Sequence, residues 1–394
     1  MSACLIHYTE AVPRRRLLRL AGCLLLAGLA LPVVAGTVLA QGREPLSSVD
    51  PYNIGGTRIV SLRPALQTWH PGGLDPFTEY SARLRLRYRF SRNANLALQT
   101  NPGQVSGLEP SLQGFTDTQA AFSYRFFRPD VALNVGLNLP TGRRELSQAA
   151  FETSTVVANS IFGFHLPTFG QGLNANVSFV WAKAVSDALV LGLGAGYEVR
   201  TTYEPVAGVR YDPGDELMLT AGLDYRLNEV TALDGNVIVR LHGKDRLDDQ
   251  DFLTVGNRYT VHLKLTRYLG FHTFSVWAYV RHQQKNEAAA AFPLVDAAQR
   301  NPNGAELHGE LRLRASPKLV IRLQGEGRLY GSTTLAFSKA RLVGLGIQPE
   351  WTMAPGVTLP FVLRAQGGSV FHRPSDERIG LFGLEVGAGI QASF

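Results

Sequence analysis

Cysteine is nearly absent from this chain of 394 residues, which has only Cys4 and Cys23. Both lie in an N-terminal stretch that we expect to be removed, so the mature protein would contain no thiol. Disulfides, cysteine-ligated metals and a cysteine nucleophile are therefore excluded from the mature protein. No catalytic residue, cofactor site or metal site is predicted elsewhere in the chain, and an enzyme is not expected.

Long apolar runs and charged residues are also scarce. No uncharged apolar run of about 18 residues, the length that a membrane-spanning helix needs, occurs after residue 40. Charged residues make up 18% of the chain, below the roughly 25% of typical soluble proteins. The hydrophobic residues, 45% of the total, must therefore be arranged in another pattern.

The first 40 residues have the three parts of a secretory signal peptide. Four arginines between residues 14 and 19 precede an apolar stretch, Leu20–Gly36, and small residues lead up to Ala40. We expect residues 1–40 to be cleaved off, 41–56 to form a periplasmic segment and 57–394 to form the folded unit. A lipoprotein signal at Cys23 is the alternative, but most of the apolar stretch follows this cysteine instead of preceding it.

The charge of the mature chain is only mildly basic. The leader carries four arginines and one glutamate, a net +3, so the formal charge falls from +7 to +4 on cleavage. No run of lysine and arginine resembles a nucleic-acid-binding patch. Because the chain is also expected to be exported, nucleic acid is excluded as a partner.

Apolar and polar residues alternate along much of the mature chain. Between Tyr80 and Phe90, tyrosine, alanine, leucine and phenylalanine take one face, and serine and four arginines take the other. The same two-residue period returns over 216–227, 306–314 and 319–328. Such segments of about ten residues are typical of transmembrane β-strands, which must close into a barrel because lipid cannot satisfy an open sheet edge. The sequence therefore predicts a transmembrane antiparallel β-barrel.

The predicted connections alternate between short and long, as in barrels with tight periplasmic turns and long extracellular loops. Counting back from the C-terminus gives fifteen strands, and Thr57–Trp69 supplies a sixteenth. Fourteen is the alternative, if Thr57–Trp69 and one other weak segment, such as Asn93–Thr100, do not span. The long connections are expected at Thr100–Gly114, Pro140–Gln171, Thr201–Gly214, Gly243–Val255, Gln283–Asn303, Tyr330–Lys339 and Gly368–Ile379.

The chain ends on Phe394, which closes an alternating strand. This ending resembles the C-terminal signature by which outer-membrane barrels are recognised for assembly, so the barrel-assembly machinery and outer-membrane lipid are expected partners. Aromatic residues gather at the predicted short-turn ends, as in an interfacial girdle. They are Phe126, Phe127, Tyr268, Phe271 and Trp351.

The polar face of the predicted strands would line the lumen, because an arginine or lysine facing the bilayer centre costs roughly 2–4 kcal/mol. The candidate lumen-lining residues are Arg83, Arg85, Arg87, Arg89, Arg125, Arg226, Glu306, Glu310, Arg312, Arg314, Arg322, Glu326, Arg328 and Arg364. Such a lumen is an aqueous path that favours anionic or carboxylated aromatic solutes, or an ion-paired network that keeps the wall rigid. The row from Arg83 to Arg89 is the most one-sided feature.

The longest connection, 140–171, contains a middle part rich in Thr, Val, Ile and Phe. We expect it to fold inward and constrict the channel, since loops of this length are usually functional or disordered. An extra hairpin above the membrane and a missed spanning strand are the alternatives.

Weaker signals favour structural roles. The aspartates at 245, 248, 249 and 251 lack an EF-hand pattern and are interpreted as a solvated acidic loop. Trp277 and Tyr279 share a face with Arg281, which suits either ordinary packing or stacking of an aromatic solute. His262 and His308 are interpreted as polar wall residues, because no spacing specifies a serine and an acid around them.

One stretch resembles a known family. Gly114-Phe115-Thr116-Asp117, Tyr124-Arg125-Phe126 and Leu137-Asn138-Leu139-Pro140-Thr141-Gly142 resemble motifs of the outer-membrane family of phenol-degradation meta-pathway proteins, which is distantly similar to FadL-type transporters. The resemblance covers about 90 residues, 114–200, and implies uptake of small organic or aromatic compounds. Arg143 departs from the acidic residue common there, and no FadL-type Asn-Pro-Ala motif is present near the N-terminus.

The sequence thus predicts a bacterial outer-membrane channel or transporter for small organic compounds, with a mildly basic lumen. A general diffusion porin gated by the 140–171 loop, and a barrel enzyme or structural outer-membrane protein, are the alternatives. The solute, the oligomeric state and any plug formed by 41–56 stay open.

Overall fold

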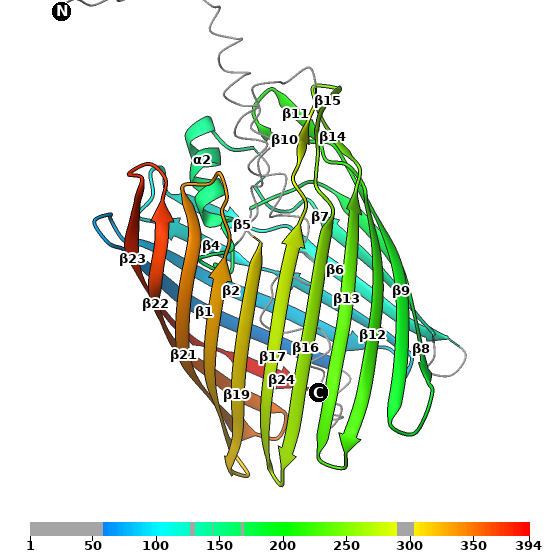
Figure 1. The fold of residues 1–394 in the computed structure, drawn as a ribbon. Coiled ribbons are helices and arrows are strands. Elements are labelled where there is room, and N and C mark those ends of the chain that lie inside the picture. The colour runs from blue at the N-terminus through cyan, green and yellow to red at the C-terminus, as the bar shows by residue number, and fades with distance from the viewer. Residues whose placement is uncertain (1–57, 127–130, 144, 167–168, 290–302) are drawn as a thin grey trace, which may run out of the picture.

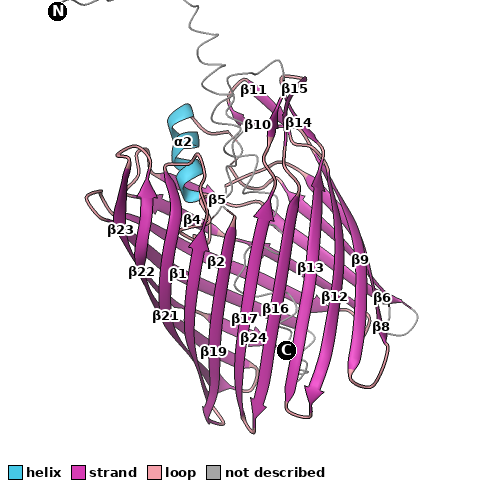
Figure 2. Ribbon diagram, in the orientation of Figure 1, coloured by secondary structure: helices cyan, strands magenta, loops and turns pink. Residues whose placement is uncertain are grey.

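The computed structural model describes residues 58–126, 131–143, 145–166, 169–289 and 303–394. The predicted leader, the 41–56 segment and Phe127 lie outside these ranges. The described residues form one closed antiparallel barrel of sixteen wall strands (Figures 1 and 2). None of the helices in these ranges is a hydrophobic segment of transmembrane length.

Each wall strand pairs with its sequence neighbour in the wall. The strands are β1 (Arg58–Pro71), β2 (Phe77–Arg89), β3 (Ala94–Thr100), β6 (Thr118–Phe126), β7 (Val131–Leu139), β8 (Asn174–Ala184), β9 (Leu189–Arg200), β12 (Glu216–Asn228), β13 (Thr231–His242), β16 (Arg258–Leu269), β17 (His272–Gln283), β19 (Gly304–Ser316), β20 (Leu319–Tyr330), β21 (Phe337–Ala354), β22 (Val357–His372) and β23 (Glu377–Ala388). The last position continues past Gly389 as β24 (Ile390–Ser393). Both β23 and β24 pair with β1, which closes the barrel.

The strand count depends on two segments whose spanning the sequence did not decide. The first, expected over Thr57–Trp69, is β1, and it pairs with β2 from Arg58 to Trp69. The second, Asn93–Thr100, corresponds to β3, which lies between β2 and β6. Sixteen strands are therefore confirmed, and the alternative of fourteen is wrong.

The outer face of the barrel is apolar, as a wall in contact with lipid requires. Leu84 and Leu86 on β2 are 44% and 36% exposed, because their alternating arginine neighbours point to the other face of the strand. The expected girdle residues Tyr268, Phe271 and Trp351 are also exposed near short turns. Alternation therefore separates hydrocarbon from a polar interior.

Phe394 closes the barrel at the chain terminus. Its backbone N–H donates to Arg58 O, and its carbonyl accepts from Arg58 N at 3.2 Å. The ring is 70% exposed. The terminal phenylalanine therefore belongs to the wall and faces outward.

The connections at one end are short and those at the other are mostly long, as predicted. Two long connections are shorter than expected, because the strands extend further: 331–336 joins β20 to β21, and 373–376 joins β22 to β23. The connection after β3 contains a hairpin of β4 (Pro102–Ser106) and β5 (Leu112–Phe115), and β4 also pairs with β2.

A second, five-stranded sheet extends beyond the wall at the long-loop end (Figure 1). Its strands come from three different connections, so the alternation of single segments did not predict it. They are β10 (Tyr203–Val206), β11 (Val209–Asp212), β14 (Lys244–Leu247), β15 (Gln250–Thr254) and β18 (Glu287–Ala288). We call it the external sheet.

Candidate functional site: the loop inside the barrel

The connection between β7 and β8 turns into the barrel, which confirms the inward fold predicted for 140–171. It first forms helix α2 (Gln148–Val157), whose N-terminus is capped by the Ser147 hydroxyl accepting from Ala150 N. Residues 158–166 follow and are mostly buried against wall strands. We call 158–166 the inner segment.

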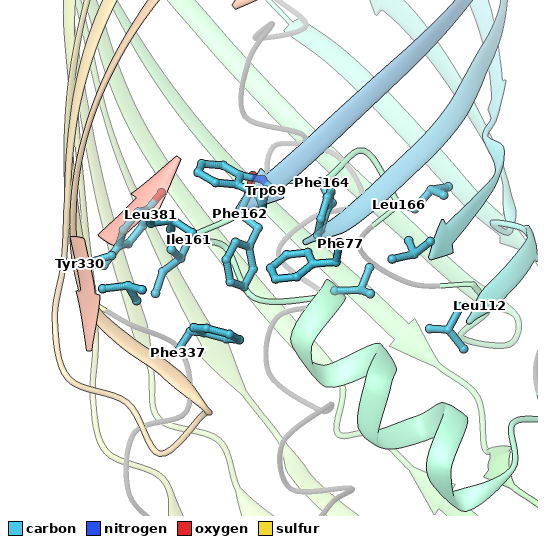
Figure 3. Close-up of a cluster of buried hydrophobic side chains, with 14 of the residues drawn as sticks. Trp69, Phe77, Leu112, Ile161, Phe162, Phe164, Leu166, Tyr330, Phe337 and Leu381 are labelled. Atoms are coloured by element: carbon cyan, nitrogen blue, oxygen red, sulfur yellow. The ribbon is translucent and has the colours of Figure 1, made fainter. Parts of the chain in front are cut away.

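Aromatic packing fixes the middle of the inner segment (Figure 3). The ring of Phe162 lies 4.9 Å from that of Phe77, 5.0 Å from that of Phe337 and 5.7 Å from that of Trp69, with edge-to-face geometry in each pair. Phe162 itself is fully buried. Such pairs contribute about 0.5–1.5 kcal/mol each beyond burial of their area. Strands β1, β2 and β21 thus hold one loop ring between them.

Backbone groups of the inner segment are bound by buried wall side chains. Phe162 O accepts from Gln67 Nε2 at 2.7 Å and from Trp69 Nε1 at 3.1 Å. The Glu79 carboxylate accepts from the backbone N–H of His165 at 3.0 Å and of Leu166 at 2.9 Å. These contacts satisfy peptide groups that would otherwise be buried at a cost of about 1–3 kcal/mol each. Glu79 and the inner segment therefore stabilise each other.

His165 lies between two charged wall residues. Its Nδ1 is 3.2 Å from Arg83 Nη2, and its Nε2 is 3.1 Å from Glu385 Oε1. A guanidinium only donates, so Nδ1 accepts and Nε2 carries the proton. Glu385 also contacts Arg364. The imidazole therefore joins the basic row of β2 to a carboxylate on β23.

The opposite end of the inner segment is bound to β17, β20 and β21. Ser160 accepts from Arg281 Nη2 through its hydroxyl at 3.1 Å, and from Tyr330 through its carbonyl at 3.2 Å. Asn159 Nδ2 donates to Phe337 O at 2.9 Å. The inner segment thus contacts strands from both sides of the β1–β23 closure.

Asp117 joins the two ends of the connection. Its Oδ1 accepts from Gly142 N at 2.9 Å, and its Oδ2 accepts from Gln171 N at 2.7 Å and from Asn138 Nδ2 at 2.8 Å. A Cβ on Gly142 would collide with Phe169 O, so the close approach of the two ends requires glycine there. Asp117, the 138–142 segment and Gln171 thus meet at this one carboxylate, which we call the clasp.

Several of the predicted lumen residues form ion pairs and hydrogen bonds along the inner wall. Glu306 accepts from Tyr330 at 2.9 Å and lies 3.1 Å from His308 Nε2, and His308 Nδ1 lies 3.5 Å from Glu326. Further along, Arg322 pairs with Glu350 at 2.9 Å, and a ladder of side-chain hydrogen bonds runs from Glu310 through Gln324 to Gln348. Arg328 contacts Gln366 and lies 3.6 Å from Glu326.

The remaining predicted arginines differ in how deeply they are buried. Arg85 and Arg87 alternate with the outward Leu84 and Leu86 and are half-buried, as is Arg312 on β19. Those nearer the short turns are exposed. They are Arg89, Arg125, Arg226 and Arg314. The structure therefore does not gather all fourteen predicted residues around one point.

Two groups that hold the inner segment against the wall were missed from the sequence: the wall residue Glu79 and His165 of the segment itself. Glu79 shares the face of Arg83 and lies four residues before it, so continuing that face toward the long-loop end would have found it. His165 carried no such signal, because its partners are 82 and 220 positions away.

The residues that gave weaker signals in the sequence, Trp277, His262 and Asp245, contact other residues of the protein. The Trp277 ring stacks on His308, with centroids 5.1 Å apart. His262 Nδ1 lies 3.5 Å from Asn236 Nδ2. Asp245 is not solvated as expected: it is buried in the external sheet and accepts from Tyr211 at 2.6 Å and from Gly214 N at 2.8 Å. Burial raises the pKa of Asp245 to about 6.

No family model matches the sequence, and no curated protein matches it either. Solved structures similar to this chain are outer-membrane proteins. CymD, a monoaromatic hydrocarbon channel, is 9% identical, with a TM-score of 0.43 over 86% of this chain and 89% of its own. OpdK from Pseudomonas aeruginosa is 11% identical, with a TM-score of 0.43 over 85% and 98%. CdiB from Acinetobacter baumannii is 11% identical, with a TM-score of 0.49 over 84% and 60%. At these values the likeness concerns the barrel fold alone.

Proposed function

We propose that this protein is an outer-membrane channel for small organic compounds, in which the inner segment constricts a charged lumen. The observation that carries the proposal is the inner segment itself, bound inside a barrel whose outer face is apolar and whose inner face is polar. A barrel that served only as a membrane anchor has no need of such a bound loop. Outer-membrane lipid around the wall, and recognition of Phe394 by the assembly machinery, belong to the same proposal.

The basic row on β2 supports a preference for anionic or carboxylated aromatic solutes. Rows of arginine set anion preference in pores, and Arg83 reaches the inner segment at His165. The likeness in sequence motifs to the phenol-degradation meta-pathway family supports aromatic or other small organic solutes. Ion pairs such as Arg322–Glu350 at the same time stiffen the wall.

Planar-bilayer recording and liposome uptake test the proposal together. We expect discrete conductance steps with anion preference, and uptake of small organic acids faster than of neutral sugars of similar size. A barrel that yields neither conductance nor uptake is not a channel.

A general diffusion porin constricted by the same loop is the second candidate. The amides of Gln324 and Gln348 favour it, because neutral amides bind water and hydroxyl groups without regard to solute charge. Liposome swelling that depends only on solute size would select this candidate over the first.

A further inference from the structure

One buried arginine in the lumen wall forms no ion pair with any residue that the structure describes. Arg258, the first residue of β16, is 3% exposed, and its Nε is sealed from solvent without a hydrogen-bond partner. Among the described residues, no carboxylate lies within ion-pair distance of its guanidinium. A buried guanidinium whose Nε makes no hydrogen bond is unfavourable, and an anion bound to it would offset this cost.

The strand register surrounds Arg258 with further cations. Arg240 on β13 is its direct cross-strand partner, and Arg281 on β17 lies two residues from Gln283, the partner on the other side. Like charges directly opposite each other destabilise a sheet. Within electrostatic range of Arg258 lie Arg240, Arg281, Glu216 and Tyr279. The wall thus concentrates positive charge at one place.

The nearest carboxylate is already occupied by other donors. Glu216 Oε1 contacts Arg240 Nη1, and Oε2 lies 2.7 Å from Arg200 Nη2 and 3.2 Å from His242 Nε2. Arg200 also lies 3.6 Å from Glu198. These contacts neutralise Arg200 and Arg240 and leave Arg258 unpaired.

We propose that Arg258, with Arg281 and Arg240 beside it, binds the carboxylate group of a small organic acid. A guanidinium offers a planar fork that matches a carboxylate, and Tyr279 lies within electrostatic range of Arg258. Arg281 also binds Ser160 of the inner segment, so the site adjoins the constriction. This inference rests on the proposed channel function and names the class of solute.

The test measures binding to the folded, detergent-solubilised full barrel by calorimetry, with phenylacetate and its uncharged counterpart phenylacetamide. Phenylacetate should bind and phenylacetamide should not. Arg258→Gln should weaken phenylacetate binding at least about tenfold, the expected loss of a charged hydrogen bond. Arg258→Lys should weaken it less, and Lys318→Gln in an exposed turn should leave it unchanged.

Thermal stability gives an independent readout. Without added anion, Arg258→Met should melt at the same or a higher temperature than the wild type, because it removes a buried unpaired charge. Phenylacetate should raise the melting temperature of the wild type alone. Equal binding of phenylacetate and phenylacetamide, binding of inorganic phosphate alone, or strong destabilisation by Arg258→Met would each overturn the proposal. Conductance without phenylacetate binding rejects this site only, whereas binding without conductance rejects the channel.

Discussion

The Glu79 carboxylate on β2 accepts the backbone N–H of Leu166, 87 positions further along the chain, at 2.9 Å. Glu79 is fully buried, and its other oxygen accepts from His165 N. One wall side chain therefore fixes two successive peptide groups of the inner segment. The position of the loop in the lumen is thus determined by specific acceptors, in addition to apolar packing.

Glu79→Gln should loosen the inner segment. Glutamine keeps the shape but offers one acceptor oxygen, so one buried N–H loses its partner at a cost of about 1–3 kcal/mol. We expect larger and noisier single-channel currents. Glu229→Gln in an exposed turn is the matched control. Unchanged currents in Glu79→Gln would mean that this contact does not hold the constriction.

Asp117→Asn should open the clasp. An asparagine amide group must face at least one of the donors Gly142 N, Gln171 N and Asn138 Nδ2, so the two ends of the connection separate. We expect faster proteolytic cleavage within 140–171 while the barrel stays folded. The control is Asp187→Asn, at an exposed turn residue, which the protease should cleave at the wild-type rate. Equal resistance of the Asp117→Asn and Asp187→Asn variants to the protease would refute the clasp.

Phe162→Ala should remove the aromatic centre of the inner segment. Buried phenylalanine-to-alanine changes cost about 3–5 kcal/mol. Trp69, which is in contact with this ring and fully buried, should become exposed to water. Tryptophan emission should shift to longer wavelength, and Phe162→Leu should show a smaller shift. No change in emission would place Phe162 outside this cluster.

The external sheet should be more stable in acid than at neutral pH. Burial raises the pKa of Asp245 to about 6 from its ordinary value near 3.8. The folded state therefore favours the protonated carboxyl group of Asp245. Protonation adds about 3 kcal/mol to the free energy of unfolding of the external sheet. This stabilisation is complete below about pH 3.8 and is lost as the pH rises through about 6.

Hydrogen exchange of the external sheet, corrected for intrinsic rates, measures this effect. Protection should fall between pH 4 and pH 7, and Asp245→Asn should keep the acid-state protection at pH 7. Asp249→Asn, on an exposed residue, should behave as wild type. Rising protection with pH would contradict the assignment.

The wall of the barrel was predictable because alternation is a local property. The pattern from Tyr80 to Phe90 is enough to tell the lipid face of β2 from its inner face, and the apolar middle of 140–171 indicated an inward loop. Contacts such as His165 with Glu385 depend on which strands become neighbours after closure, and a single sequence does not specify this. The external sheet was missed for the same reason, since its strands of two to five residues come from separate connections.

The most direct test of the account replaces residues 146–166 with a short Gly-Ser linker and compares single-channel conductance with that of the wild type. The chain can be rejoined there because Asp117 holds Gly142 and Gln171 together. The account predicts a folded barrel with a clearly larger conductance and weaker solute discrimination. A folded variant with wild-type conductance and selectivity would contradict it.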